Sequence, residues 1–262
     1  MTADKNPTPR RRRPTVLLTG LLAGVLGAAL FAPAAAQDAV ARHDACLERA
    51  RSDPQQALED ARAWEVEGGG NAARHCAAVA LEAAGDPGAA ADIYSDLGRE
   101  LAEIDPPFAA GLYDASALAL LDAGRPQEAG AMADRAVALA PDVPDHRITR
   151  ARVAVAQGDE WGAADRLGSA IGKAPDRADL YHLRAAVYRR LGVLALARDD
   201  IDRALELTPN DPALYLERGN IRRLAGDDEA AAEDWRRVTR MAPGTPEGEA
   251  AGVHLQRLPG ND

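Results

Sequence analysis

The chain has 262 residues, of which 47% are hydrophobic, 27% are charged and only two are cysteine. These values exclude a collagen-like chain, a polar disordered tail and a disulfide-rich miniprotein. Aromatic residues make up 4%, so the core must be built from Ala, Leu, Val and Ile, which favours closely packed helices over strands. The net charge of −10 argues against general nucleic-acid binding, because contacts with phosphates need a basic surface.

The first 36 residues have the plan of a secretory signal peptide. Four arginines, Arg10 to Arg13, precede an uncharged stretch whose apolar part runs from Val16 to Phe31. Small residues at 34–36 then supply a cleavage site before Gln37. An uncleaved membrane anchor is the alternative, since the run is long enough to span a bilayer. We expect cleavage by the general secretory or the twin-arginine route, and a periplasmic or secreted bacterial protein.

The rest of the chain repeats with a period of 34 residues. Five columns recur in register: one of glycine, one of proline and three that are mostly alanine. The glycines are Gly124, Gly158, Gly192 and Gly226, and the prolines are Pro141, Pro175, Pro209 and Pro243. The first small column is Ala129, Ala163, Ala197 and Ala231; the second is Ala117, Ala151, Ala185 and Gly219. A further column holds Ala136, Ala170, Ala204 and Val238.

Each column has a physical reading. Glycine ends a first helix in a conformation that costs other residues a Cβ clash. The small residues let two helices approach closely, and proline cannot continue the second helix. The pattern therefore predicts one helix–turn–helix unit per period, with the units stacked on one another.

This pattern resembles the tetratricopeptide repeat family, most strongly over residues 110–245. Tyr113, Tyr181 and Tyr215 take the bulky position of the first helix, and Trp235 takes the large aromatic position of the second. The resemblance implies an all-α, right-handed solenoid. The family's usual leucine before the first small residue is replaced by Ser116, Arg150, Arg184 and Arg218.

Two of these arginines have an aspartate sixteen residues further on. Arg184 is followed by Asp200, and Arg218 by Asp234. A separation of sixteen places the second residue on the partner helix of the same unit. We expect two ion pairs of modest energy.

One solenoid domain is predicted for residues 37–262. Divergent repeats are expected at about 38–70 and 71–109, regular repeats at 110–143, 144–177, 178–211 and 212–245, and a capping helix at 246–258. Around Glu100–Phe108 we expect a longer helix broken at Pro106 and Pro107. Thr245, Pro246 and Glu247 carry the signals of a helix start, and the helix that follows would cover the apolar end of the stack.

No catalytic motif is recognisable, and neither an enzyme activity nor a cofactor is expected. The sequence lacks a nucleophile elbow, a phosphate loop, a zinc-protease motif and a haem-attachment motif. Paired carboxylates occur only at positions that read as solvated or capping. The glycines at 68–70 read as a turn between helices, because no strand precedes them.

Cys46 and Cys76 fall on the first helices of adjacent units. In an oxidising compartment this arrangement favours a disulfide, which would close a loop of about 30 residues. The alternative is a metal site, because His43 and His75 lie near the same cysteines. Two separate buried thiols are the third possibility.

The functional surface implied by the resemblance is the groove lined by the first helices. The positions that match it are Asp114, Leu118, Leu121, Ile148, Arg152, Val155, His182, Ala186, Arg189, Leu216, Asn220 and Arg223. Arg152, Arg189 and Arg223 would form a basic stripe able to bind carboxylates through forked hydrogen bonds. The competing interpretation is that these arginines are solvated or paired with neighbouring acids. The family's carboxylate clamp of Lys and Asn is not reproduced.

The sequence thus predicts a noncatalytic interaction module that binds a protein or peptide, with an acidic segment as one option. No nucleic acid, no metal and no membrane insertion after signal cleavage are expected. The alternatives are a self-associating cell-envelope scaffold and, less favoured, a metal-binding protein at the His/Cys cluster.

Overall fold

The computed structural model describes residues 34–258, with side chains from residue 38. The signal-peptide prediction falls mostly on residues outside this range. The described part is all-α and consists of thirteen helices packed as tandem pairs. Their bounds are α1 Ala34–Ser52, α2 Pro54–Val66, α3 Gly70–Ala83, α4 Pro87–Leu101, α5 Pro106–Asp122, α6 Pro126–Leu139, α7 Pro144–Ala156, α8 Glu160–Lys173, α9 Ala178–Arg190, α10 Leu194–Leu207, α11 Pro212–Leu224, α12 Asp228–Met241 and α13 Pro246–Gln256. None of these helices is long and apolar enough to cross a membrane.

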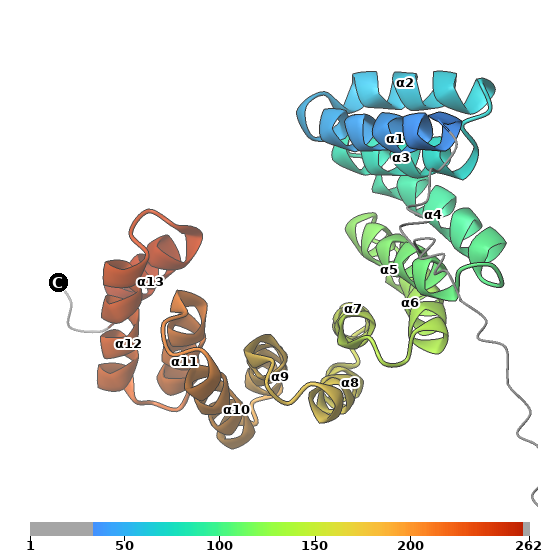
Figure 1. Cartoon of the computed structure of the whole chain (residues 1–262). Coiled ribbons are helices and arrows are strands. Elements are labelled where there is room, and N and C mark those ends of the chain that lie inside the picture. Colours follow the sequence, from blue (N-terminus) through green and yellow to red (C-terminus); the bar gives the residue numbers. More distant parts are fainter. Residues whose placement is uncertain (1–33, 259–262) are drawn as a thin grey trace, which may run out of the picture.

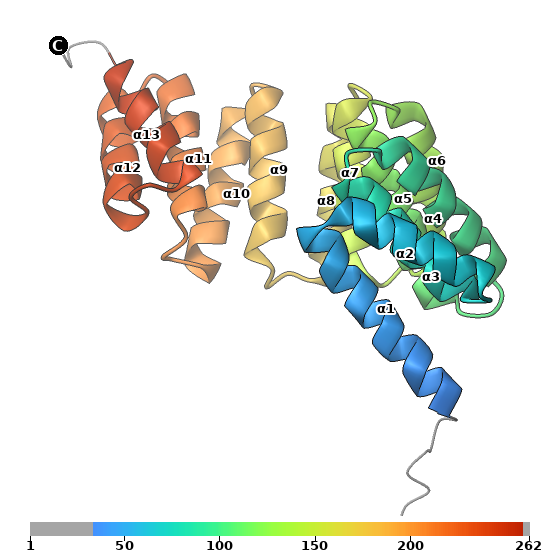
Figure 2. The same cartoon turned by 90° about the horizontal axis from the view of Figure 1, so that it is seen from above.

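The pairs stack into an arc with two layers (Figure 1). The odd-numbered helices α5, α7, α9 and α11 lie on the inner, concave side, and α6, α8, α10 and α12 lie on the outer side. Helix α13 packs on α12 and α11 at one end of the arc, while α1 packs on α2 and α3 at the other. Seen from above, α1 projects past its neighbours (Figure 2).

The repeat columns occupy the positions that the sequence predicts. The four glycines at the end of the first helix have positive φ, between 69° and 85°. In the four regular repeats, the second helix (α6, α8, α10 or α12) ends two residues before the proline of that repeat. The alanines at 129, 163, 197 and 231 are fully buried, because they lie where two helices approach closely.

The second small column shows why its last member is glycine. Ala117, Ala151 and Ala185 are buried. At Gly219, a Cβ atom would lie 2.5 Å from Nε1 of Trp235. The indole of this repeat therefore occupies the space that an alanine methyl takes in the others.

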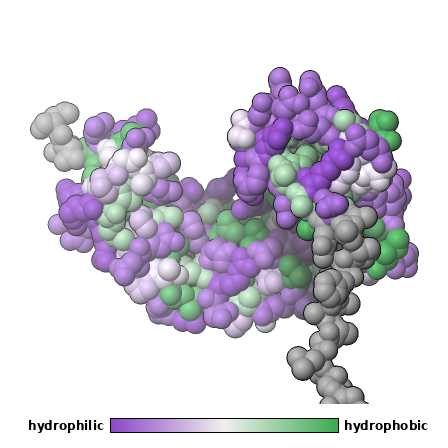
Figure 3. Space-filling model, turned by 45° about the horizontal axis from the view of Figure 1, so that its top comes forward, coloured by the Kyte–Doolittle hydropathy of each residue, from purple (hydrophilic) through white to green (hydrophobic). Residues whose placement is uncertain are grey.

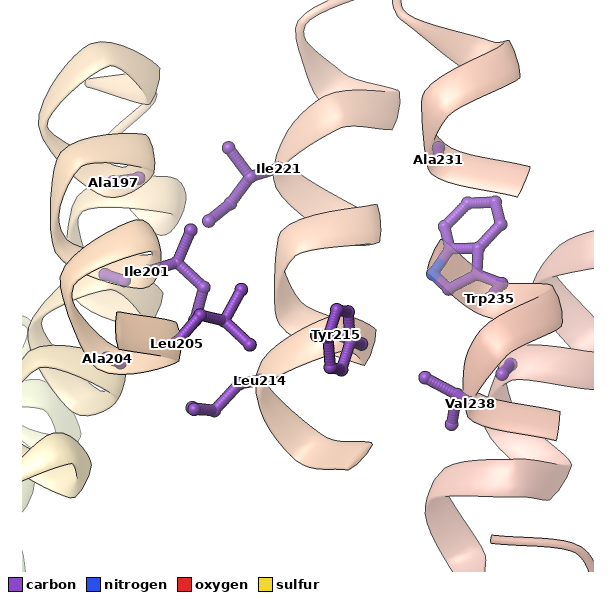
Figure 4. Close-up of a cluster of buried hydrophobic side chains, with 12 residues drawn as sticks. Ala197, Ile201, Ala204, Leu205, Leu214, Tyr215, Ile221, Ala231, Trp235 and Val238 are labelled. Atoms are coloured by element: carbon purple, nitrogen blue, oxygen red, sulfur yellow. The ribbon is translucent and has the colours of Figure 1, made fainter. Parts of the chain in front are cut away.

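Figure 4 shows the core between α10, α11 and α12. Ile201 and Leu205 of α10 face α11, and Tyr215 of α11 points toward Trp235 and Val238 of α12. Large side chains fill this core. By contrast, the core of α1–α3 is built from five alanines with Cys46 and Cys76.

Polar contacts also repeat with the period. Tyr181 and Tyr215 each donate a hydrogen bond to the carbonyl oxygen of the proline six residues before, at 3.1 and 3.0 Å. Arg147, one period before Tyr181, donates to the carbonyl oxygen of Pro141 at 3.0 Å. This bond ties each first helix to the turn that precedes it.

Both predicted arginine–aspartate pairs are confirmed. Arg184 forms a two-pronged pair with Asp200 at 2.8 and 2.7 Å, and Arg218 does the same with Asp234 at 3.0 and 2.8 Å. The aspartates are buried and the arginines partly buried.

The prediction of a longer helix around residues 100–108 was wrong. Helix α4 ends at Leu101, a turn follows, and α5 begins at Pro106. Asp105 caps α5 by accepting a hydrogen bond from the Phe108 amide at 3.1 Å. A proline in the first turn of a helix lacks only an amide that would have no partner there, so the two prolines start α5 and do not break a helix.

Candidate binding groove

The middle of the concave face carries two adjoining hollows, one polar and one apolar. The polar hollow has a volume of about 370 Å³ and lies on α5, α7 and α9. It is lined by Asp114, Leu118, Asp145, Ile148, Thr149, Arg152, Arg177, Asp179, His182 and Leu183. Figure 3 shows hydrophobic surface on the concave side of the arc, between its two ends.

The carboxylates of the polar hollow are held by neighbouring groups. Arg177 pairs with Asp145 at 2.8 Å and grips Asp179 with two hydrogen bonds. These bonds, first that to Asp179, raise the pKa of the Arg177 guanidinium, and Arg177 in turn lowers the pKa of the Asp179 carboxyl. Asp179 therefore stays ionised and paired with Arg177 near neutral pH.

Asp114 meets two groups of the next repeat. Its Oδ2 accepts a hydrogen bond from the Thr149 hydroxyl at 3.1 Å. Its Oδ1 lies 3.1 Å from Nδ1 of His146, although the two atoms are not aligned for a hydrogen bond. Asp114 thus links α5 to α7 across the floor of the groove.

The apolar slot lies between α7 and α9 and has a volume of about 60 Å³. Its lining is Ile148, Ala151, Arg152, Val155, Leu167, Leu183 and Val187. Helices α5 and α7, and α9 and α11, are in direct backbone contact, whereas α7 and α9 are less closely joined. The slot lies where α7 and α9 of the inner layer are further apart.

The three arginines of the predicted basic stripe have different surroundings. Arg152 is exposed, and no ion pair or hydrogen bond to another described residue holds its guanidinium. Arg189 donates to the buried carboxylate of Glu217 at 2.7 Å, and Arg223 pairs with Asp228 at 3.0 Å. The positive charge available to a ligand is therefore concentrated at Arg152.

The remaining groove positions lie in two places. Asp114 and His182 line the polar hollow with Arg152. Asn220 lies one repeat further on, where its amide donates a hydrogen bond to Glu217 at 3.4 Å. The structure therefore brings Asp114, Arg152 and His182 together, and places Arg189 and Asn220 around a buried acid.

At the C-terminal end of the arc, α13 packs on α12 and α11. His254 stacks on Trp235, with ring centres 4.9 Å apart and planes inclined by 21°. Burial, then the charges of Arg257 and Arg189, lowers the pKa of His254.

At the other end, Cys46 and Cys76 lie at disulfide distance, with their Cα atoms 6.1 Å apart. Nε2 of His43 lies 3.0 Å from Nδ1 of His75. Burial, then the charge of His43, lowers the pKa of His75. Within residues 38–258, no three or more His, Cys, Asp or Glu side chains are grouped so as to hold a metal ion.

Sequence reasoning missed several groups in the groove. Arg177 precedes α9 in a turn, where the equivalent residues of the neighbouring repeats are Val143 and Asp211, so no column marks it. His146 and Thr149 lie on α7 outside the columns that the period marks. Leu183 and Val187 lie on α9, and the period alone does not show that they border an open slot.

Residues 178–211, which span α9 and α10, match the tetratricopeptide repeat family model. The matched stretch is one helix pair of the described part of the chain. No curated protein is recognisably similar to it in sequence.

Solved structures with a similar fold have low sequence identity to this chain. A tetratricopeptide repeat protein from Parabacteroides merdae is 19% identical with a TM-score of 0.61, covering 86% of this chain and 85% of that one. The pilF protein of Pseudomonas aeruginosa is 17% identical with a TM-score of 0.58, covering 82% and 99%. MamA of Desulfovibrio magneticus is 19% identical with a TM-score of 0.56, covering 67% and 97%.

Proposed function

We propose that this protein is a noncatalytic module that holds an extended segment of another protein along its concave face. The observation that carries this proposal is the pair of adjoining hollows at the middle of the arc. One offers polar groups and the other apolar surface, and both face the same groove. Binding sites of repeat solenoids are extended concave surfaces of this kind.

The proposed compartment is the periplasm or the exterior of a bacterium. Two observations support it: the signal-like plan of residues 1–36 and the disulfide distance between Cys46 and Cys76. Disulfides form and persist in oxidising compartments.

The groove is tested by site-specific photo-cross-linking in the cells that make the protein. A photoreactive amino acid at His182, which lines the polar hollow, is compared with one at Ser169, an exposed residue of the outer helix α8. We expect a discrete cross-linked partner from position 182 and none, or a different set, from position 169.

The opposite result contradicts the proposal. Equal capture from both positions would place the partner on another face. A cross-link from position 182 to a second copy of the chain would favour the self-associating scaffold, which would also show a concentration-dependent size.

A further inference from the structure

The apolar slot is suited to a single small side chain. Apart from Arg152, every residue that lines it is nonpolar, and the space is only about 60 Å³. Val155 and Leu183 are partly exposed at its mouth, while Ala151 and Leu167 form its buried lining. An aliphatic side chain entering it would exchange water for nonpolar contacts on several sides, which favours binding.

Arg152 stands at the border between the two hollows. It lines both of them, as do Ile148 and Leu183. In the polar hollow, Asp145 and Asp179 share Arg177, and Asp114 contacts His146 and Thr149. Arg152 is the charged lining group that no described residue neutralises. A guanidinium in this position binds a carboxylate through two parallel hydrogen bonds.

The site lies at the middle of the arc, with inner helices continuing on both sides (Figure 1). The polar hollow extends over α5 in one direction, and α9 leads to α11 in the other. A segment bound here would continue past the slot at both ends. The carboxylate that reaches Arg152 therefore belongs to an acidic side chain within the segment and not to a chain terminus.

We propose that the centre of the groove recognises an internal peptide segment in which an aliphatic residue stands next to an aspartate or glutamate. The aliphatic side chain enters the slot between α7 and α9, and the carboxylate pairs with Arg152. This inference rests on the proposed function, because it assigns a ligand class to the same groove.

The probe is a display library of random heptapeptides inserted between two flexible linkers, so that neither end is free. We expect enrichment of sequences in which Leu, Ile, Val or Met adjoins Asp or Glu. An enriched peptide is labelled and its affinity measured by fluorescence anisotropy. It should bind Arg152→Gln about tenfold more weakly than the natural chain, as expected for losing a charged hydrogen bond. Replacing the peptide's acid by its amide should weaken binding to the natural chain by a similar factor, and should have little further effect on Arg152→Gln.

Two variants complete the test. Val155→Thr keeps the side-chain shape but replaces one methyl group by a hydroxyl at the mouth of the slot, and it should weaken binding several-fold. Arg190→Gln is the matched control, since Arg190 is also an exposed arginine of an inner helix, α9, but is paired with Glu160; it should change affinity less than about twofold. Circular dichroism should show equal helicity in all variants.

The outcomes separate the two proposals. Peptides that cross-link from position 182 but bind Arg152→Gln with unchanged affinity would overturn the central subsite and leave the groove function standing. Peptides that bind without cross-linking from position 182 would count against both. A library without any enriched sequence would overturn the subsite, while the partner capture in cells would still decide the groove.

Discussion

At the scale of single residues, the column that holds Arg150, Arg184 and Arg218 forms ion pairs with aspartates of neighbouring helices. Asp234 has 4% of its side chain exposed and forms ion pairs with both Arg218 and Arg222. Among the described residues, Asp200 forms an ion pair with Arg184 alone. Arg150 occupies the same column but pairs with Asp134 of the preceding helix, because the position sixteen residues further on is Arg166. The chemistry of the partner position therefore decides which helix each arginine ties down.

Asp234→Asn should destabilise the C-terminal repeats by about 2–3 kcal/mol. Removing one partner from a buried pair commonly costs about 3–5 kcal/mol, and the partial exposure of the two arginines reduces that cost. The measurement is urea unfolding followed by circular dichroism. Asp202→Asn is the control, because Asp202 is half exposed and 3.6 Å from the same Arg218; it should cost about 0.5 kcal/mol or less. Equal costs for the two variants would show that burial does not set the strength of these pairs.

At the scale of the helices, the two ends of the solenoid are held by different means. The C-terminal pairs have large buried side chains, among them Trp235, Leu214 and Ile221. Alanine dominates the core between α1, α2 and α3, and an alanine methyl removes little apolar area from water. A covalent link between α1 and α3 would offset this weak packing.

We predict that Cys46 and Cys76 are bonded in the native protein and that the bond holds α1. On the loop-entropy model, a closed loop of about 30 residues contributes roughly 3–4 kcal/mol. Reduction, or the double change Cys46→Ser and Cys76→Ser, should speed amide hydrogen exchange in residues 38–52 and leave α9–α12 nearly unchanged. Such a local response follows from a solenoid in which each repeat contacts only its neighbours.

The intact mass of protein isolated from its own cells provides the independent check. We expect a chain that begins at Gln37 and lacks two hydrogens. Two free thiols together with unchanged exchange after reduction would contradict the prediction, and stoichiometric metal would revive the alternative of a site at His43 and His75.

At the scale of the whole molecule, both ends of the arc carry a partly buried histidine. His75 lies among α1, α4 and α5, near His43, Tyr94 and Phe108. His254 joins α13 to Trp235 of α12. Burial lowers the pKa of each below the ordinary value of 6.5, assisted by His43 at one end and by Arg257 and Arg189 at the other. Protonation of either histidine therefore works against the packing of a terminal helix.

The chain should accordingly lose stability as the pH falls below about 6.5. The unfolded state takes up protons first, because its histidines keep the ordinary pKa; stability is complete above that pH and declines toward the lower folded pKa. The measurement is the melting temperature between pH 8 and pH 5.5, where most carboxylates remain ionised. His75→Gln and His254→Gln should each flatten part of the dependence. A melting temperature that is constant over this range would contradict the prediction.

In the groove, some features follow from the repeat period and others depend on contacts between neighbouring repeats. The period places Asp114, Arg152 and His182 on one face. Asp114 and His182 are two periods apart, and Arg152 lies one helical turn past the equivalent position on α7. The period does not show that Arg189 and Glu217, 28 residues apart, are paired. That contact depends on the rotation between α9 and α11 and on side-chain conformations that no repeat column encodes.

The sequence alone predicted the helix pairs, their glycine and proline ends, the Thr245 cap and the buried alanine columns. Apart from the cap, these features depend on backbone conformation and on contacts that recur in every repeat, so a single chain records them several times. Three features emerge only from the packing of neighbouring helices: two of the three groove arginines are neutralised, Arg177 holds two aspartates, and an apolar slot opens between α7 and α9. Each of these arises once, from how neighbouring helices are spaced and which charges they bring together, and a feature that occurs once leaves no periodic signal.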